Sequence, residues 1–111
     1  MPMDVATFRK LVAMDENDPL SRFGLGQALF QTGGDDALPE AADHLRFANA
    51  KAPGHLATYH ILSQVLIRLG ETDEARRVLS AGIERVGDIG EGMGRDLGPA
   101  MAEMRASLDR D

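Results

Sequence analysis

The sequence predicts an all-α protein built from antiparallel helical hairpins, and three observations lead to this fold class. Apolar residues between Leu56 and Gly87 recur at spacings of three and four, which is the period of one helix face. Gly and Pro residues separate the apolar stretches, where helices commonly end or begin. The pattern of the central stretch also occurs a second time upstream, as in proteins built from repeats.

The central stretch, 56–87, contains two amphipathic segments joined by a short polar turn. The apolar face of the first is Tyr59, Leu62, Leu66 and Leu69. The apolar face of the second is Ala75, Val78, Leu79, Gly82, Ile83 and Val86. Gly70 follows the first segment, as glycine often does at a helix end, and the acidic residues after it suit the positive end of a second helix. The stretch is therefore interpreted as a helical hairpin.

The upstream copy of this pattern makes the hairpin a repeat. Its first helix matches at a separation of 37 positions, pairing Leu25, Gly26, Gln27, Leu29 and Gly33 with Leu62, Ser63, Gln64, Leu66 and Gly70. Its second helix matches at 34 positions, pairing Ala41, Leu45, Ala48 and Pro53 with Ala75, Leu79, Gly82 and Gly87. A further step of 34 positions gives Thr7, Leu11, Met14 and Pro19, so the N-terminus is interpreted as the second half of an earlier repeat.

These residues resemble a known repeat family. Tyr59, Leu62, Ser63, Leu66, Gly70, Ala75, Leu79 and Gly82 resemble the tetratricopeptide repeat motif. Two positions depart from it: Gly82 replaces the usual second Ala, at a cost of about 1 kcal/mol in helix propensity, and Gly87 replaces the usual Pro. The resemblance implies an α-α superhelix of stacked antiparallel hairpins, similar to the small stand-alone tetratricopeptide proteins of bacteria.

We expect one domain over residues 1–111, divided into five segments. These are a half-repeat helix at 4–18, a first repeat at 19–55, a second repeat at 56–87, a Gly-rich loop at 88–96 and a capping helix at 97–110. Asp18 is expected to cap the helix after it, and Pro19 and Pro39 to occupy first turns. Glycines at 87, 90, 92 and 94 predict the loop, because each disfavours helix by about 1 kcal/mol. The last helix should cover the final repeat with a polar outer face.

Composition excludes several classes of function. Cysteine is absent, so disulfides, thiolate metal sites and a cysteine nucleophile are excluded. The net charge of −6 argues against nucleic acid and against an anionic membrane surface. The N-terminus has no apolar core of signal-peptide length, and no run approaches the roughly 18 apolar residues that span a bilayer, so a cytoplasmic location is the expectation.

No catalytic or cofactor motif is found, and we expect neither an enzyme nor a bound cofactor. His44, His55 and His60 do not have the spacing of a helical metal pair, so no metal site is expected. The Gly90–Gly94 segment follows a helix and lacks the Lys-Ser or Lys-Thr pair of a phosphate loop. No serine is placed beside an evident activating base.

The resemblance implies that the first helix of each hairpin lines a concave surface where ligands lie. Two matched sets of residues occupy that face: Phe23, Gln27, Phe30 and Gln31 in the first repeat, and His60, Gln64, Ile67 and Arg68 in the second. The alternative is a plain solvated face with the two Phe residues in the core. Chaperone-binding members hold a terminal carboxylate with a Lys and an Asn, but Phe23 and Gln27 stand at those places here, so that clamp is not expected.

The predicted function is a non-catalytic protein-interaction module, or scaffold, that binds a peptide or helix of a protein partner in the concave groove. The partner's identity does not follow from the sequence. One alternative is self-association as a weak homodimer through the exposed flank around Phe8 and Val12. A remote alternative is a small-molecule-binding or enzymatic protein.

Overall fold

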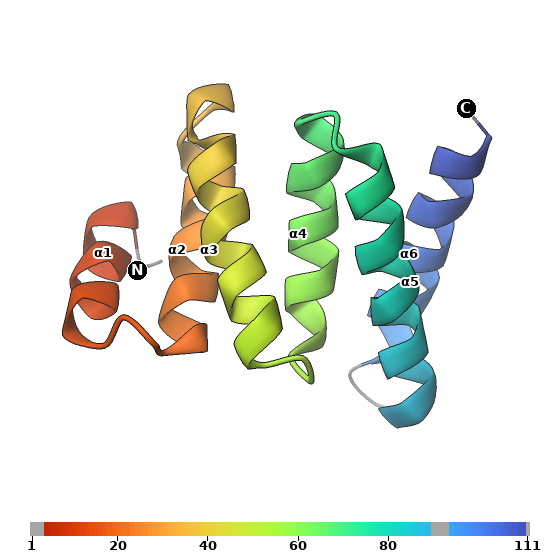
Figure 1. Cartoon of the computed structure of the whole chain (residues 1–111), viewed down its shortest axis with the longest axis horizontal. Helices are drawn as coiled ribbons and strands as arrows, with labels where there is room; N and C mark the ends of the chain where they lie inside the picture. Colours follow the sequence, from red (N-terminus) through yellow and green to blue (C-terminus); the bar gives the residue numbers. More distant parts are fainter. Residues whose placement is uncertain (1–3, 90–93, 111) are drawn as a thin grey trace. The chain divides into compact units, whose positions relative to one another are not determined.

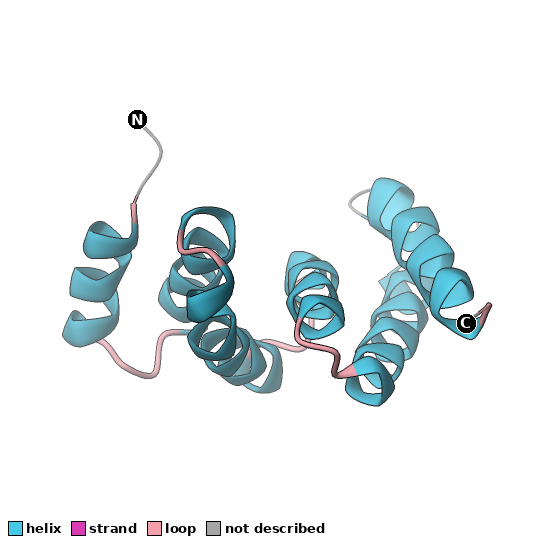
Figure 2. Ribbon diagram, turned by 90° about the horizontal axis from the view of Figure 1, so that it is seen from above, coloured by secondary structure: helices cyan, strands magenta, loops and turns pink. Residues whose placement is uncertain are grey.

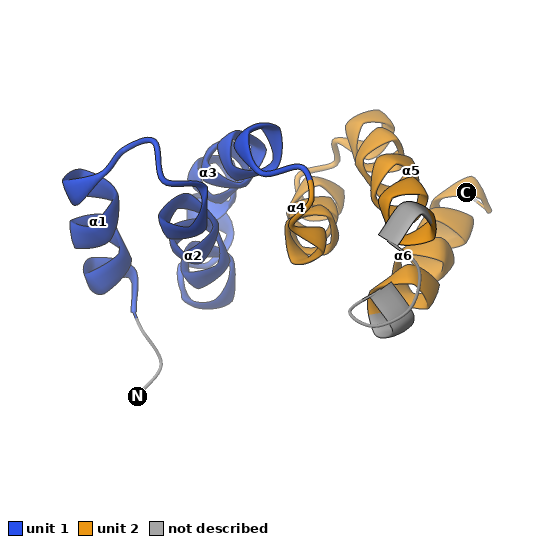
Figure 3. Ribbon diagram, turned by 90° about the horizontal axis from the view of Figure 1, so that it is seen from below, with its two compact units in different colours: residues 1–53 blue, residues 54–111 orange. Residues whose placement is uncertain are grey.

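The computed structural model describes residues 4–89 and 94–110, and these residues form helices and no strand (Figures 1 and 2). Six α-helices, packed as sequential hairpins, and one short 3-10 turn occur within the described ranges. The predicted all-α hairpin fold is confirmed. The chain groups into two compact units, residues 1–53 and 54–111 (Figure 3), and each is described by itself.

The first unit contains three α-helices and the 3-10 turn. They are α1 (Val5–Met14), α2 (Pro19–Thr32), η1 (Asp35–Ala37) and α3 (Leu38–Lys51). The hairpin of α2 and α3 holds the core of this unit, which consists of Leu25, Ala28, Leu29, Leu38, Ala41, Ala42, Leu45 and Ala48. These residues repeat at the spacings that the sequence predicted for two facing helices.

Short polar side chains set the helix starts in this unit. The carboxylate of Asp4 accepts a hydrogen bond from the Thr7 backbone N–H at 2.9 Å and so caps α1. The carboxylate of Asp18 does the same for the Leu20 N–H at 3.1 Å, and Pro19 occupies the first turn of α2. Pro39 likewise lies in the first turn of α3. The predicted cap and both proline positions are confirmed.

Two glycines of α2 allow its neighbours to approach closely. A Cβ on Gly24 would lie within 2.7 Å of the Phe8 ring carbon Cζ, so only glycine leaves room for the α1 aromatic ring. A Cβ on Gly26 would lie 2.6 Å from Leu45 Cγ of α3. Because these two positions of α2 are glycines, α1 packs closely against Gly24 and α3 packs closely against Gly26.

A polar cluster joins the three helices of the first unit. The guanidinium of Arg9 on α1 donates two hydrogen bonds to Glu40 on α3, at 2.6 and 3.0 Å. Glu40 also lies 3.2 Å from His44 Nε2, and His44 Nδ1 lies 3.3 Å from the guanidinium of Arg22 on α2. Because Arg22 can only donate, Nδ1 must accept, and the ring proton sits on Nε2 and points to Glu40.

The Glu40 carboxylate should make the free energy of unfolding depend on pH in the acidic range. Its hydrogen bonds to Arg9 lower its pKa from 4.5 to about 2. A lowered folded-state pKa adds stability that is complete above pH 4.5 and is lost as the pH falls towards 2. Since the Arg9–Glu40 pair is about half exposed, we expect it to contribute about 1 kcal/mol at most to the free energy of unfolding. The difference in unfolding free energy between wild type and Glu40→Gln should be present at pH 6 and shrink by pH 2.5; a difference independent of pH would contradict this assignment.

The second unit contains three α-helices, two of which are the longest among the described residues. They are α4 (Leu56–Arg68), α5 (Thr72–Ile89) and α6 (Gly94–Asp109). Helix α4 ends as the sequence predicted, because Gly70 adopts a φ of +80°. The Glu71 N–H then donates to the Leu66 carbonyl at 2.9 Å and the Gly70 N–H to the Ile67 carbonyl at 3.0 Å, the paired bonds of a Schellman ending. The chain turns there and α5 packs back on α4.

Helix α6 closes the core of this unit. Met101 on α6 is fully buried, as are Leu62 and Leu66 on α4 and Leu79 on α5. The contact centres on Gly82, where a Cβ would lie 2.8 Å from both Met101 Sδ and Tyr59 Cβ. Helices α4, α5 and α6 therefore meet at a point where α5 has no side chain.

The predicted Gly-rich loop at 88–96 is too long. Helix α5 continues through Gly87 to Ile89, and α6 begins at Gly94, which leaves only residues 90–93 between them, outside the described residues. The capping helix was expected at 97–110 and begins three residues earlier, with Pro99 inside it. Tertiary packing outweighs the propensity of single glycines here: a Cβ on Gly98 would lie 3.1 Å from Val86 Cγ1, so the two helices are in close contact.

Candidate functional site

The first predicted set of site residues lies on α2. Phe23, Gln27 and Phe30 are half-buried, and Gln31 is exposed. The spacings of four and seven place these side chains along one side of the helix. The buried residues Leu25, Ala28 and Leu29 lie at the positions between them. The set is therefore distinct from the fully buried core of its unit, and both aromatic rings retain accessible surface.

The second set lies on α4. Gln64 Nε2 is 3.4 and 3.5 Å from the two ring nitrogens of His60, so the amide lies close to the imidazole. Ile67 is 37% exposed, which makes it one of three large apolar side chains that remain exposed among the described residues. Arg68 follows in the last turn and is exposed. Together they form a face with hydrogen-bonding groups, one apolar side chain and one cation.

The chemistry of these two faces suits polypeptide recognition. Carboxamide groups both donate and accept hydrogen bonds, as a partner's backbone requires. Half-exposed Phe rings and Ile67 offer apolar area, and an arginine can bind a carboxylate through two parallel hydrogen bonds. None of these side chains is arranged as a nucleophile with an activating base.

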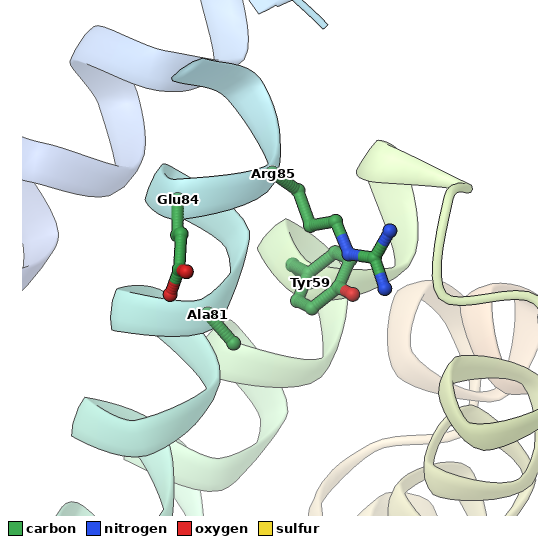
Figure 4. Close-up of a pocket in the computed structure, with 4 residues that line it drawn as sticks. All are labelled: Tyr59, Ala81, Glu84 and Arg85. Atoms are coloured by element: carbon green, nitrogen blue, oxygen red, sulfur yellow. The ribbon is translucent and has the colours of Figure 1, made fainter. Parts of the chain in front are cut away.

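A separate hollow that the sequence did not predict lies in the second unit. It encloses about 400 Å³ and is lined by Tyr59, Ala81, Glu84 and Arg85. In Figure 4 the Arg85 side chain extends on the Tyr59 side of the hollow, whereas Glu84 lies on the other side of Ala81. Sequence periodicity assigned Tyr59 to the core, where it is 4% exposed, and offered no signal that its edge would border a cavity.

Other kinds of site were also sought. No group of three His, Asp or Glu side chains in the described ranges could hold a metal ion. His55 Nδ1 lies 2.8 Å from the Thr58 hydroxyl, and His44 lies between Glu40 and Arg22, so both rings are held by local partners. Among the residues that the structure covers, no helix has the length and apolarity that crossing a membrane requires.

The fold is shared with solved structures of low sequence identity. The type III secretion translocator chaperone SycD of Yersinia enterocolitica matches with a TM-score of 0.84 and 18% identity, over 96% of this chain and 70% of that one. The Sgt2 tetratricopeptide domain of Aspergillus fumigatus matches with a TM-score of 0.69 and 14% identity, over 96% of this chain and 69% of that one. At these identities, the likeness concerns the fold.

Sequence comparison identifies the family. No curated protein sequence matches significantly. The model of the tetratricopeptide repeat matches residues 34–88, which run from η1 through the α4–α5 hairpin. This is the region in which Tyr59, Leu62 and Ala75 carry the motif. The chain belongs to the tetratricopeptide repeat family.

Proposed function

We propose that this chain is a non-catalytic module that binds a protein partner through the α2 and α4 faces. The observation that carries the proposal is the accessibility of the eight predicted residues. Every one is half-buried or exposed, and this includes the large apolar side chains of Phe23, Phe30 and Ile67. Apolar side chains that stay accessible offer contact area to a partner, and the amides beside them can exchange hydrogen bonds with it. Each face is proposed as a contact surface in its own right.

Family membership supports this proposal. The two structures of similar fold are described as a translocator chaperone and a tetratricopeptide domain. The partner we propose is a peptide segment or an amphipathic helix. On the α2 face it would offer an apolar side chain to Phe30 and exchange hydrogen bonds with Gln27. On the α4 face it would offer an apolar side chain to Ile67 and exchange hydrogen bonds with Gln64, and a carboxylate would suit Arg68.

Substituting both faces should weaken binding without unfolding the protein. Phe30→Ala with Gln64→Ala removes one apolar anchor and one hydrogen-bonding group, and we expect a loss of at least tenfold in affinity, which corresponds to about 1.4 kcal/mol or more. The measurement is capture of the partner from lysate of the source cells, followed by titration of the captured protein with each variant.

The matched control is Arg77→Ala. Arg77 is exposed on α5 and lies outside both faces, so its removal should leave affinity unchanged. Circular dichroism melts of the double variant would show that the fold is retained. An affinity equal to that of wild type in a folded double variant would refute the assignment of the binding faces.

A further inference from the structure

Helix α1 is the least buried of the three α-helices of the first unit. It has ten residues, and none of them is buried. Isolated helices of this length are marginal in water, so α1 depends on its contacts with the rest of the unit. Its apolar side chains Val5, Phe8, Leu11 and Val12 are only half-buried, and Met14 at its end is 82% exposed.

Two specific contacts hold α1 in place. The Phe8 ring occupies the space left by Gly24 on α2, and Arg9 binds Glu40 on α3 through two hydrogen bonds. The buried core of this unit consists of α2 and α3 residues, including Leu25 and Leu45, and none of α1. The surface that α1 covers is therefore a preformed site for a helix with an aromatic residue followed by an arginine.

The connection between α1 and α2 is suited to opening. The residues at its two ends, Asp15 and Asp18, already have extended backbones. Pro19 disfavours a continuous helix across the connection, since the residue before a proline avoids the helical region. Few hydrogen bonds hold the connection in this conformation. Among them, Arg22 Nε donates to the Glu16 carbonyl at 2.9 Å, and the Asn17 N–H donates to the Asp15 carboxylate at 3.1 Å. Straightening the connection would release α1 while α2 and α3 stay paired.

We propose that two copies of this chain exchange α1, so that Phe8 and Arg9 of one copy bind Gly24 and Glu40 of the other. The occupant is a second copy because its α1 carries the aromatic residue and the cation that this site fits. Every contact of the closed monomer is reproduced in the exchanged pair, which is why such exchange is a low-cost route to dimers. This inference goes beyond partner binding and is independent of the α2 and α4 faces.

Charge reversal on either side of the ion pair tests the exchange. In Arg9→Glu, residue 9 repels Glu40 within one chain, and in Glu40→Arg, residue 40 repels Arg9. In a mixture of the two variants, reciprocal exchange restores an opposite-charge pair at both sites. After the two full-length chains are unfolded and refolded together, light scattering during gel filtration should show a heterodimer. Its dissociation constant should be at least tenfold lower than that of either variant alone.

Two controls separate exchange from other association. A chain that carries both reversals restores the pair internally and should behave as wild type. Phe8→Ala in both mixed variants removes the Gly24 contact and should abolish the heterodimer, which simple attraction between surfaces would not. A mixture that forms no more dimer than its components overturns the proposal. So does a dimer that forms equally in wild type and all variants, because that would be association without exchange.

Discussion

Gly82→Ala should lower the free energy of unfolding by about 1–2 kcal/mol, although it restores the residue that the repeat motif usually has there. Alanine in a helix gains about 1 kcal/mol over glycine. Here, however, the new Cβ would lie 2.8 Å from Tyr59 Cβ and 3.0 Å from Tyr59 Cγ. These atoms lie at the base of a buried side chain and cannot move aside easily. Overpacking costs about 1–3 kcal/mol, and a short contact with atoms that cannot move belongs to the upper part of that range, about 2–3 kcal/mol, which outweighs the gain in propensity.

Gly87→Ala provides the matched control for this prediction. Gly87 lies in the same helix, is exposed, and has nothing within 4 Å of an added Cβ. The substitution should therefore raise the free energy of unfolding by about 0.5–1 kcal/mol. Urea denaturation of both variants measures the contrast. A gain in stability for both would show that α5 has room at Gly82 and that the close contact with Tyr59 does not restrict it.

The helices were predictable because their signals are local. A spacing of three and four defines a buried face, and the predicted faces of Leu62, Leu66 and Leu79 are buried as expected. Asp18 and Pro19 at the start of α2 act within one turn of the chain, so their roles could also be inferred directly. The eight predicted site residues are accessible in the structure, and their part in binding stays a prediction.

The remaining features depend on contacts between residues far apart in the sequence. Arg9 and Glu40 are 31 positions apart, and no local pattern predicts that pair. The extent of α5 and α6 was underestimated for a similar reason. Glycine propensity was judged residue by residue, whereas the contact between Val86 and Gly98 brings the two helices together. The hollow beside Tyr59 depends on the shapes of α4 and α5 together, which periodicity does not describe.

Met101→Ala should be the most damaging single substitution in α6. The side chain is fully buried where α6 meets α4 and α5, and truncating such a methionine typically costs about 2–5 kcal/mol. Met104, three residues further on, is only half-buried, so Met104→Ala should cost less than half as much. Urea denaturation of the two variants compares them. Equal losses would mean that α6 does not complete the core of its unit through Met101.

The two sites should also be coupled. Met101 Sδ lies 2.8 Å from the position of a Cβ on Gly82, so removing the methionine side chain frees part of the space that Gly82→Ala needs. Residues in contact show interaction energies of about 0.5–3 kcal/mol in double-mutant cycles. The Gly82→Ala, Met101→Ala double variant should therefore lose less stability than the sum of the single variants. Strict additivity would place the two residues out of contact, and α6 would then be held by its polar bonds, such as that from Arg76 to Asp109 at 2.9 Å.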